Sequence, residues 1–296
     1  MSSYAKIHQP GRKAFTVLSV VILVVMAALA ILPFIMIITG SLSSSDEIIK
    51  HGYSLKIQKF SLDAYRMIFL QPEAILCSFG VSIVVTLFGT LAGLVIMSMA
   101  GYALQCRELR YAGNISFYFY FTTLFSGGLV PWYMLISNMG MRDTIWSLII
   151  PMLCSSFNIL LIRNFMKQIP ESLAESAKID GASHLRIFVQ IMLPLSKPIL
   201  ATVALFVALS YWNNWYLASL FITDVNLWPL QFRLHRVLTA AQAVAQGGAE
   251  HFTNAVIPTE TVKLATATVA TAPILVLYPF LQKYFVAGIT IGAVKG

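Results

Sequence analysis

Charged residues are scarce in this sequence, and their scarcity restricts what kind of protein it can be. Asp, Glu, Lys and Arg make up 11% of the 296 residues, whereas hydrophobic residues make up 58%. Soluble globular domains carry about 25% charged residues, so this chain cannot expose its whole surface to water. The composition excludes an ordinary soluble domain and indicates a protein embedded in a lipid bilayer.

Motifs that would mark an enzyme, a metal site or a nucleotide site are also missing from the sequence. There is no H-E-x-x-H pair and no G-x-x-x-x-G-K-[ST] phosphate loop. The three cysteines form no C-x-x-C pair, so neither a disulfide framework nor a zinc site is indicated. We therefore expect a chain that is not an enzyme and holds no cofactor. Any ATP that drives it must be bound by another protein.

Six stretches are long and apolar enough to cross a bilayer. Lipid cannot hydrogen-bond stray backbone groups, so each stretch must be a helix. The stretches cover about 14–39, 75–104, 114–137, 144–162, 199–222 and 264–282. The third contains two glycines and a proline, so we expect it to bend. The sequence predicts an all-α integral membrane protein with about six transmembrane helices, forming a single transmembrane domain over residues 1–296.

The basic residues indicate how the chain is oriented. The formal net charge is +8, but Lys and Arg lie between the apolar stretches rather than in one patch, so we expect no nucleic-acid partner. Cytoplasmic loops of membrane proteins retain Lys and Arg. If the N-terminus is cytoplasmic, 12 of the 20 basic residues lie inside. We therefore expect both termini and loop 163–198 to be inside, and loops 40–74 and 223–263 to be outside.

The interiors of the six stretches contain no Asp, Glu, His, Lys or Arg. Ionisable residues inside the membrane mark proton and ion relays, so a proton-coupled carrier is disfavoured. A stand-alone secondary transporter that binds sodium through backbone carbonyls stays open as an alternative. It would work by itself on an ion gradient, whereas an ATP-driven transporter would need partner subunits.

The inner loop predicts two short helices separated by a sharp turn. Pro170 suits the first position of a helix, and Gly181 supplies the left-handed residue at which many helices end. Ser183 can cap a second helix, which we expect Pro194 to interrupt. Such an amphipathic pair could dock into a groove of another protein. A helix pair lying on the lipid surface explains the pattern equally well.

This loop resembles the EAA loop of binding-protein-dependent ABC importer permeases, whose pattern is E-A-A-x3-G-x9-I-x-L-P. The matching positions are Glu175, Ala177, Gly181, Ile191, Leu193 and Pro194, with Ser176 in place of the second alanine. The neighbouring DGAS segment, which includes Asp180, is similar to the carbohydrate-uptake branch and its smaller permease subunit. The resemblance extends over nearly the whole chain, including 127–144, 210–222 and 282–296.

The resemblance implies a mechanism and a set of partners. The loop would insert into a cytoplasmic ATPase dimer, which binds the ATP and Mg²⁺ that this chain lacks. A second, longer permease would form a pseudo-symmetric heterodimer with this chain, and an extracytoplasmic solute-binding protein would deliver the substrate. The location implied is the bacterial cytoplasmic (inner) membrane. The implied cargo is an oligosaccharide, including acidic ones of the aldouronate or alginate type.

Polar and aromatic residues in the later stretches are candidates for the substrate path. Amide and aromatic side chains suit sugar rings, which present hydroxyls and apolar faces, although the same residues also serve helix packing and aromatic belts. The candidates are Asn213, Asn214, Tyr216, Asn158 and Tyr133. In the last outer loop, Arg233, His235 and Arg236 would suit a uronate, but ordinary loop solubility explains them as well.

Overall fold

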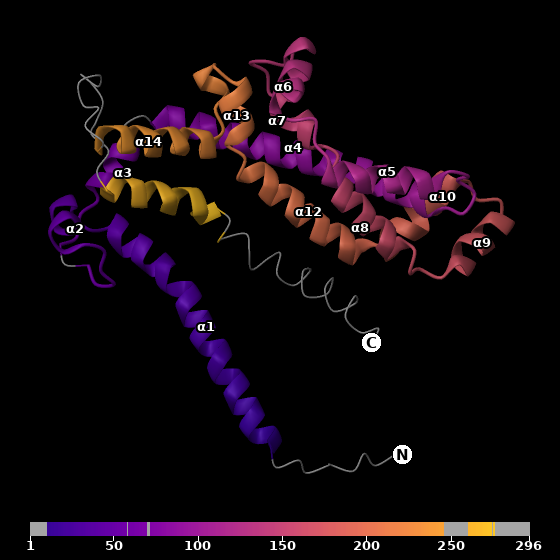
Figure 1. The fold of residues 1–296 in the computed structure, drawn as a ribbon, viewed down its shortest axis with the longest axis horizontal. Helices are drawn as coiled ribbons and strands as arrows, with labels where there is room; N and C mark the ends of the chain where they lie inside the picture. The colour runs from indigo at the N-terminus through magenta and orange to yellow at the C-terminus, as the bar shows by residue number, and fades with distance from the viewer. Residues whose placement is uncertain (1–10, 58, 70–71, 246–259, 274, 276–296) are drawn as a thin grey trace. The chain divides into compact units, whose positions relative to one another are not determined.

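The computed structural model describes residues 11–57, 59–69, 72–245, 260–273 and 275, and it is a helical protein (Figure 1). Within these ranges the only β-bridge is an isolated one that joins Ser43 and Phe60. The chain divides into two compact units, residues 1–70 with 237–269 and residues 71–236 with 270–296.

The first unit contains α1 (Gly11–Ser41), the first of the expected spans. Its segment Phe15–Ser41 reaches a mean hydropathy of 3.2 over 18 residues, and none of that window is buried inside the protein. Burial of apolar surface is worth about 25 cal/mol per Å², so an uncovered helix of this kind is unstable in water. The helix therefore belongs in lipid, as the apolar stretch at 14–39 predicts.

The remainder of the first unit packs around a small apolar cluster at one end of α1. Helices α2 (Ser45–His51) and α3 (Asp63–Ile68) follow α1 in the chain. Ala64 of α3 is buried with Val262 and Ala265 of the helical segment 260–273. The Ser41 and Tyr65 hydroxyls hydrogen-bond at 2.8 Å and join the end of α1 to α3. Within the expected outer loop 40–74, the described residues 42–57 and 59–69 are thus folded and contain two short helices.

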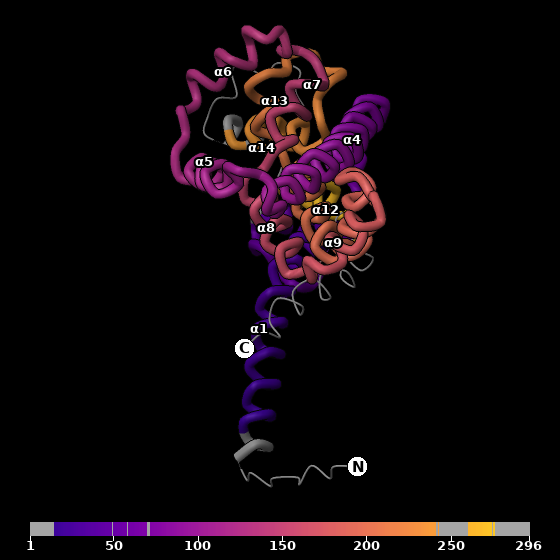
Figure 2. The backbone as a smooth tube through the Cα atoms, turned by 90° about the vertical axis from the view of Figure 1, so that its right-hand side faces the viewer, coloured from indigo at the N-terminus to yellow at the C-terminus, as the bar shows by residue number. Residues whose placement is uncertain are grey.

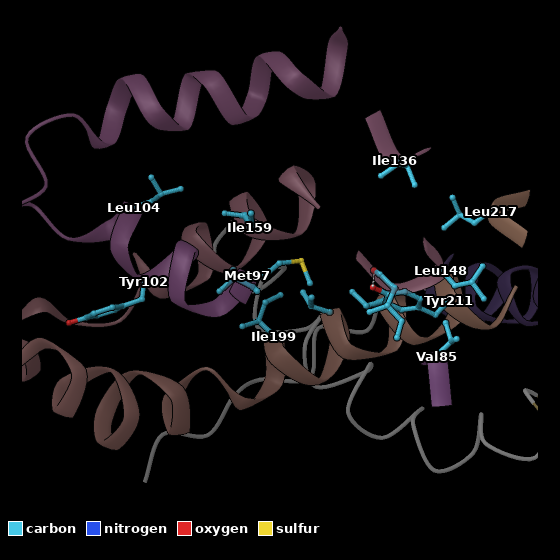
Figure 3. Close-up of a cluster of buried hydrophobic side chains, with 14 of the residues drawn as sticks. Val85, Met97, Tyr102, Leu104, Ile136, Leu148, Ile159, Ile199, Tyr211 and Leu217 are labelled. Atoms are coloured by element: carbon cyan, nitrogen blue, oxygen red, sulfur yellow. Dashed lines mark hydrogen bonds between the residues drawn. The ribbon is translucent and has the colours of Figure 1, made fainter. Parts of the chain in front are cut away.

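The core of the second unit is formed by three helices. Helix α4 (Pro72–Gln105) packs against α8 (Ser156–Met166) and α12 (Lys197–Trp212) (Figure 2). Met97, Ile159 and Ile199, one from each helix, belong to the same buried cluster (Figure 3). With 34 residues at about 1.5 Å each, α4 extends beyond a hydrocarbon layer of about 30 Å.

Glycines on α4 let its neighbours approach closely. A Cβ atom at Gly89 would lie 2.4 Å from the ring of Tyr211 on α12, and one at Gly101 would lie 2.9 Å from Ile162 on α8. The hydroxyl of Tyr211 donates a buried hydrogen bond of 2.8 Å to the Ile149 carbonyl. The small residues of this span therefore serve packing within the chain.

Several spans are broken rather than straight. Helices α5 (Ala112–Leu124) and α6 (Leu129–Asn138) meet at 112°, and α7 (Trp146–Ile149) with the 3-10 turn Ile150–Met152 meets α8 at 45°. The bend expected in the third stretch is therefore confirmed. Counting each bent pair as one span, the described residues contain up to five candidate spans. The sixth expected stretch, 264–282, lies partly outside the described residues.

One expectation about the later spans was wrong. The stretch 199–222 is not one helix, because α12 ends at Trp212 and α13 (Tyr216–Phe221) begins anew after three residues. The Asn214 side chain accepts a hydrogen bond of 2.9 Å from the Leu217 N–H and so starts α13, a role that asparagine favours over a helix interior. The outer loop after it contains a 16-residue helix, α14 (Leu230–Ala245).

Candidate functional site

The segment Glu171–Leu195, called the elbow below, folds as two helical arms around a glycine turn. The first arm is α9 (Glu171–Ile179), and the second consists of α10 (His184–Ile187), the π-helix Phe188–Met192 and α11 (Leu193–Leu195). Figure 1 shows α9 next to α10 at one end of the second unit. The two-helix interpretation of the inner loop is confirmed.

Gly181 closes the first arm with a Schellman motif. Its φ is +80°, its N–H bonds the Lys178 carbonyl at 2.9 Å, and the Ala182 N–H bonds the Ala177 carbonyl at 2.9 Å. These are the two hydrogen bonds that define the motif. A Cβ atom at Gly181 would meet nothing within 4 Å, so glycine is required here for its backbone conformation alone.

The second arm begins as expected but does not stop where expected. Ser183 accepts a hydrogen bond from the Arg186 N–H and caps α10. Pro194 does not interrupt the helix, because a π-helical turn precedes it and the backbone stays helical to Leu195. A wider turn of this kind accommodates a residue that cannot donate a hydrogen bond. The break comes at Ser196, where the axis turns by 82° into α12.

The first arm is exposed over nearly its whole surface. No residue of α9 is buried, and the side chain of Ile179 is 87% exposed. Leu185 on α10 is also exposed. Ala177 and Ala182 are partly buried against the core, so the inner face of the turn is packed while its tip is free. The tip of the turn therefore presents an uncovered apolar side chain.

The residues that the EAA resemblance singles out divide between these two faces. Glu175, Asp180, Gly181 and Pro194 are exposed, whereas Ala177, Ile191 and Leu193 are partly buried and packed against the core. The exposed positions are therefore accessible to a partner. Ala177 packs the first arm against the rest of the unit, and Ile191 and Leu193 pack the second.

Residues 106–111, between α4 and α5, hold the elbow by ion pairs. Arg107 contacts Glu171 at the start of α9 with a distance of 2.7 Å between Nη2 and Oε2. Glu108 forms an ion pair with Lys178 near the end of α9 and contacts His184 at 2.8 Å. The hydrogen bond from Lys178 holds the pKa of Glu108 below its usual value, and Glu108 raises the pKa of Lys178. Both groups are thus charged at neutral pH.

A pocket of about 320 Å³ lies between residues 105–108 and the first arm. It is lined mainly by charged and polar side chains, among them Arg107, Glu108, Glu175 and Lys178. No group of three or more His, Cys, Asp or Glu residues within the described part of the chain could hold a metal ion. The charged lining gives the pocket the chemistry of a polar interface.

The substrate-path candidates do not form one site. Asn213 and Tyr216 are exposed at the break between α12 and α13. Asn214 is used locally, since its amide also points to the sulfur of Met152 at 2.8 Å. Tyr133 stacks on Phe221 at 5.4 Å, and the buried Asn158 lies in α8 with no hydrogen-bond partner for its Oδ1.

Tyr216 also borders an open pocket of about 470 Å³ at the bend between α5 and α6, together with Trp132 and Gly128. Only Tyr216 of the five candidates lines this pocket. Among the basic residues of the outer segment, Arg233 is engaged inside the protein. It donates to the Ser78 hydroxyl at 2.6 Å and to the Val225 carbonyl at 3.1 Å.

Two residues of the elbow region were missed by sequence reasoning. Ile179 could have been noticed as an apolar residue off the face of α9 that carries Ala174 and Ala177, because it is out of phase with their helical spacing. Glu108 carried no such signal. Its contacts to Lys178 and His184 join residues about 70 positions away in the sequence, and only the packing of α4 against the elbow reveals them.

The fold and the site define a helical membrane protein with an exposed two-armed elbow between two of its membrane-spanning segments. The model for the family described as "Binding-protein-dependent transport system inner membrane component" matches residues 3–291, and the chain belongs to this family. It is a multi-pass permease subunit of an ABC importer in the bacterial inner membrane, and ATP hydrolysis takes place on a separate subunit.

Individual proteins show the same similarity along nearly their whole length. Protein LplC of Bacillus subtilis is 42% identical over 284 residues, covering 96% of each chain. The polygalacturonan/rhamnogalacturonan transport system permease protein YtcP of the same organism is 39% identical, covering 93% of this chain and 96% of YtcP. A solved bacterial ABC transporter involved in the import of the acidic polysaccharide alginate contains a chain with a TM-score of 0.79 and 29% identity, covering 96% of this chain and all of that one.

Proposed function

We propose that the elbow is the element through which a cytoplasmic ATPase dimer drives this permease. The observation that carries the proposal is the exposed tip of the elbow, where 87% of the surface of Ile179 is solvent-accessible beside the Schellman turn. Glu175 and Asp180 would make polar contacts to the ATPase. Ala177 and Gly181 would allow close approach, while Ile191, Leu193 and Pro194 anchor the second arm.

The proposal includes an orientation and partners for the chain. Both termini and the elbow lie in the cytoplasm, and residues 40–74 face outward, as the distribution of Lys and Arg favours. A longer second permease pairs with this chain, and ATP and Mg²⁺ are bound by the ATPase alone. An extracytoplasmic binding protein delivers the substrate. The single transmembrane domain over 1–296 is part of the same proposal.

The transported substrate is an oligosaccharide. Relatives whose names state a cargo include permeases for polygalacturonan or rhamnogalacturonan, for arabinooligosaccharides, for melibiose, raffinose and stachyose, and for trehalose and maltose. We place Asn213 and Tyr216 on the path because both are exposed at a helix break. Asn214, Asn158 and Tyr133 would support the path from behind through packing. An acidic sugar is the favoured class, since the solved relative imports an acidic polysaccharide, although Arg233 is not free to bind it.

Reconstitution tests the proposal against the stand-alone carrier. The chain alone, and the chain with its second permease, ATPase and binding protein, are placed in liposomes with labelled oligogalacturonide outside. We expect uptake only in the full complex and only with ATP inside. Uptake by the chain alone on a sodium gradient would contradict the proposal. Replacing the acidic sugar by a neutral arabinooligosaccharide then separates the two substrate classes.

A further inference from the structure

One carboxylate contacts both arms of the elbow. Glu108 forms an ion pair with Lys178, in the last turn of α9, through Oε1. Its other oxygen, Oε2, lies 2.8 Å from Nε2 of His184, the first residue of α10. Lys178 and His184 stand on either side of Gly181, so Glu108 bridges the turn at which the two arms meet.

The same region of the chain holds the other end of the first arm. Arg107 contacts Glu171, in the first turn of α9, at 2.7 Å. Arg107 and Glu108, which are adjacent in the chain, therefore contact α9 at both of its ends. No residue of α9 is fully buried, so these ion pairs act together with the partly buried Ala174 and Ala177, which pack against the core, to set its direction.

Glu108 is joined in turn to the core of the unit. It lies three residues after the end of α4 at Gln105. The hydroxyl of Tyr102, on the last turn of α4, lies 3.4 Å from Nδ1 of His184, and its ring packs 5.2 Å from that of Phe188. Tyr102 is buried in the same cluster as Met97 (Figure 3). A short chain of contacts thus joins the elbow to α4, the longest helix among the described residues.

The exposure of the Glu108–Lys178 ion pair indicates that it positions α9 rather than stabilises the fold. The Glu108 and Lys178 side chains are 57% and 37% exposed, and ion pairs open to water contribute little to folding. Removing the carboxylate should therefore leave the protein folded. What changes is the direction in which α9 points, because its other polar anchor is the pair at Arg107.

We propose that Glu108 is a positioning residue that ties both arms of the elbow to the end of α4 and so transmits the movement of the ATPase to the α4–α8–α12 core. The inference rests on the proposed docking of the elbow. It adds the element on the permease side that receives the movement. It predicts that the charge at residue 108 affects stimulated ATP hydrolysis through its contacts with residues 178 and 184, and not through a contact with the ATPase.

The test uses the complete complex in nanodiscs and measures ATP hydrolysis with and without loaded binding protein. Glu108→Gln should assemble normally and lose about threefold to tenfold of the stimulated rate, the effect of one or two exposed ion pairs on a coupled equilibrium. Glu108→Lys should lose at least as much, and the exchange Glu108→Lys with Lys178→Glu should recover most of it. Asp63→Asn, which removes an exposed ion pair to Arg66 elsewhere in the chain, should behave like the wild type.

Two results would overturn the inference. One is a wild-type stimulated rate in Glu108→Gln, and the other is a charge exchange that performs no better than Glu108→Lys alone. If Glu108→Gln did not assemble, Lys178→Gln and His184→Gln would test the same contacts from the elbow and should show the same loss. Absence of any stimulation in the wild-type complex would instead contradict the proposed docking itself, so the two failures are distinct.

Discussion

Replacing Gly181 by valine should uncouple transport from ATP hydrolysis while leaving the protein in the membrane. The residue has a φ of +80°, a region that β-branched residues avoid, and holding it there costs about 1–3 kcal/mol. Nothing lies within 4 Å of the new Cβ, so the cost is one of backbone strain and not of collision. If the elbow relaxes to escape the strain, the docking-competent form falls about 5- to 150-fold.

The chain offers a matched control for this substitution at Gly140. That residue ends α6 with a φ of +69° and also has nothing within 4 Å of a Cβ. It carries the same Schellman motif, with the Gly140 N–H bonded to Ser137 and the Met141 N–H bonded to Ile136. Gly140→Val therefore introduces the same strain of about 1–3 kcal/mol away from the elbow.

Both variants are reconstituted with the partner subunits and assayed for melting temperature, ATP hydrolysis and oligosaccharide uptake. We expect similar losses of melting temperature in the two variants but loss of stimulated hydrolysis and uptake only in Gly181→Val. Gly181→Asn should be intermediate, since asparagine tolerates positive φ. Normal stimulation in Gly181→Val, or an equal loss in Gly140→Val, would refute the reasoning.

Two further substitutions test the packing and the exposed tip separately. Gly89→Ala should lower the melting temperature of the purified complex, because the added methyl group overpacks against Tyr211 at a cost of about 1–3 kcal/mol. The control Gly113→Ala on α5 should not lower it, because the added methyl group meets nothing within 4 Å. Equal melting temperatures in the two variants would contradict the close approach of α4 and α12. Ile179→Glu should leave the melting temperature unchanged, because the side chain is 87% exposed, yet weaken binding of the ATPase in a pull-down at least tenfold; undiminished capture would exclude Ile179 as an anchor.

Much of the membrane architecture could be predicted because apolar length is a local property. The spans at 14–39 and 75–104 correspond to α1 and α4, since a run of that length has no stable alternative in lipid. The breaks were harder to predict. Asn213 and Asn214 lie within a run whose hydropathy alone favours one helix, and the chain breaks there because the amide side chain caps α13.

The elbow was predictable for a similar reason and within similar limits. Gly181 and Ser183 act through hydrogen bonds to residues within five positions, so their roles follow from local chemistry. Pro194 misled, because a π-helical turn can absorb a proline that an α-helix cannot. The ion pair between Glu108 and Lys178 joins residues far apart in the sequence, and helical spacing rules relate only residues close together in the chain.

The most direct measurement is the labelling of a cysteine at the elbow tip. Ile179→Cys is introduced after Cys77, Cys106 and Cys154 are replaced by serine, and a membrane-impermeant maleimide is applied to intact cells and to inside-out vesicles. The account predicts labelling only in vesicles stripped of the ATPase and protection once the ATPase is added back. Labelling from the outer face of intact cells, or labelling that the ATPase does not diminish, would contradict it.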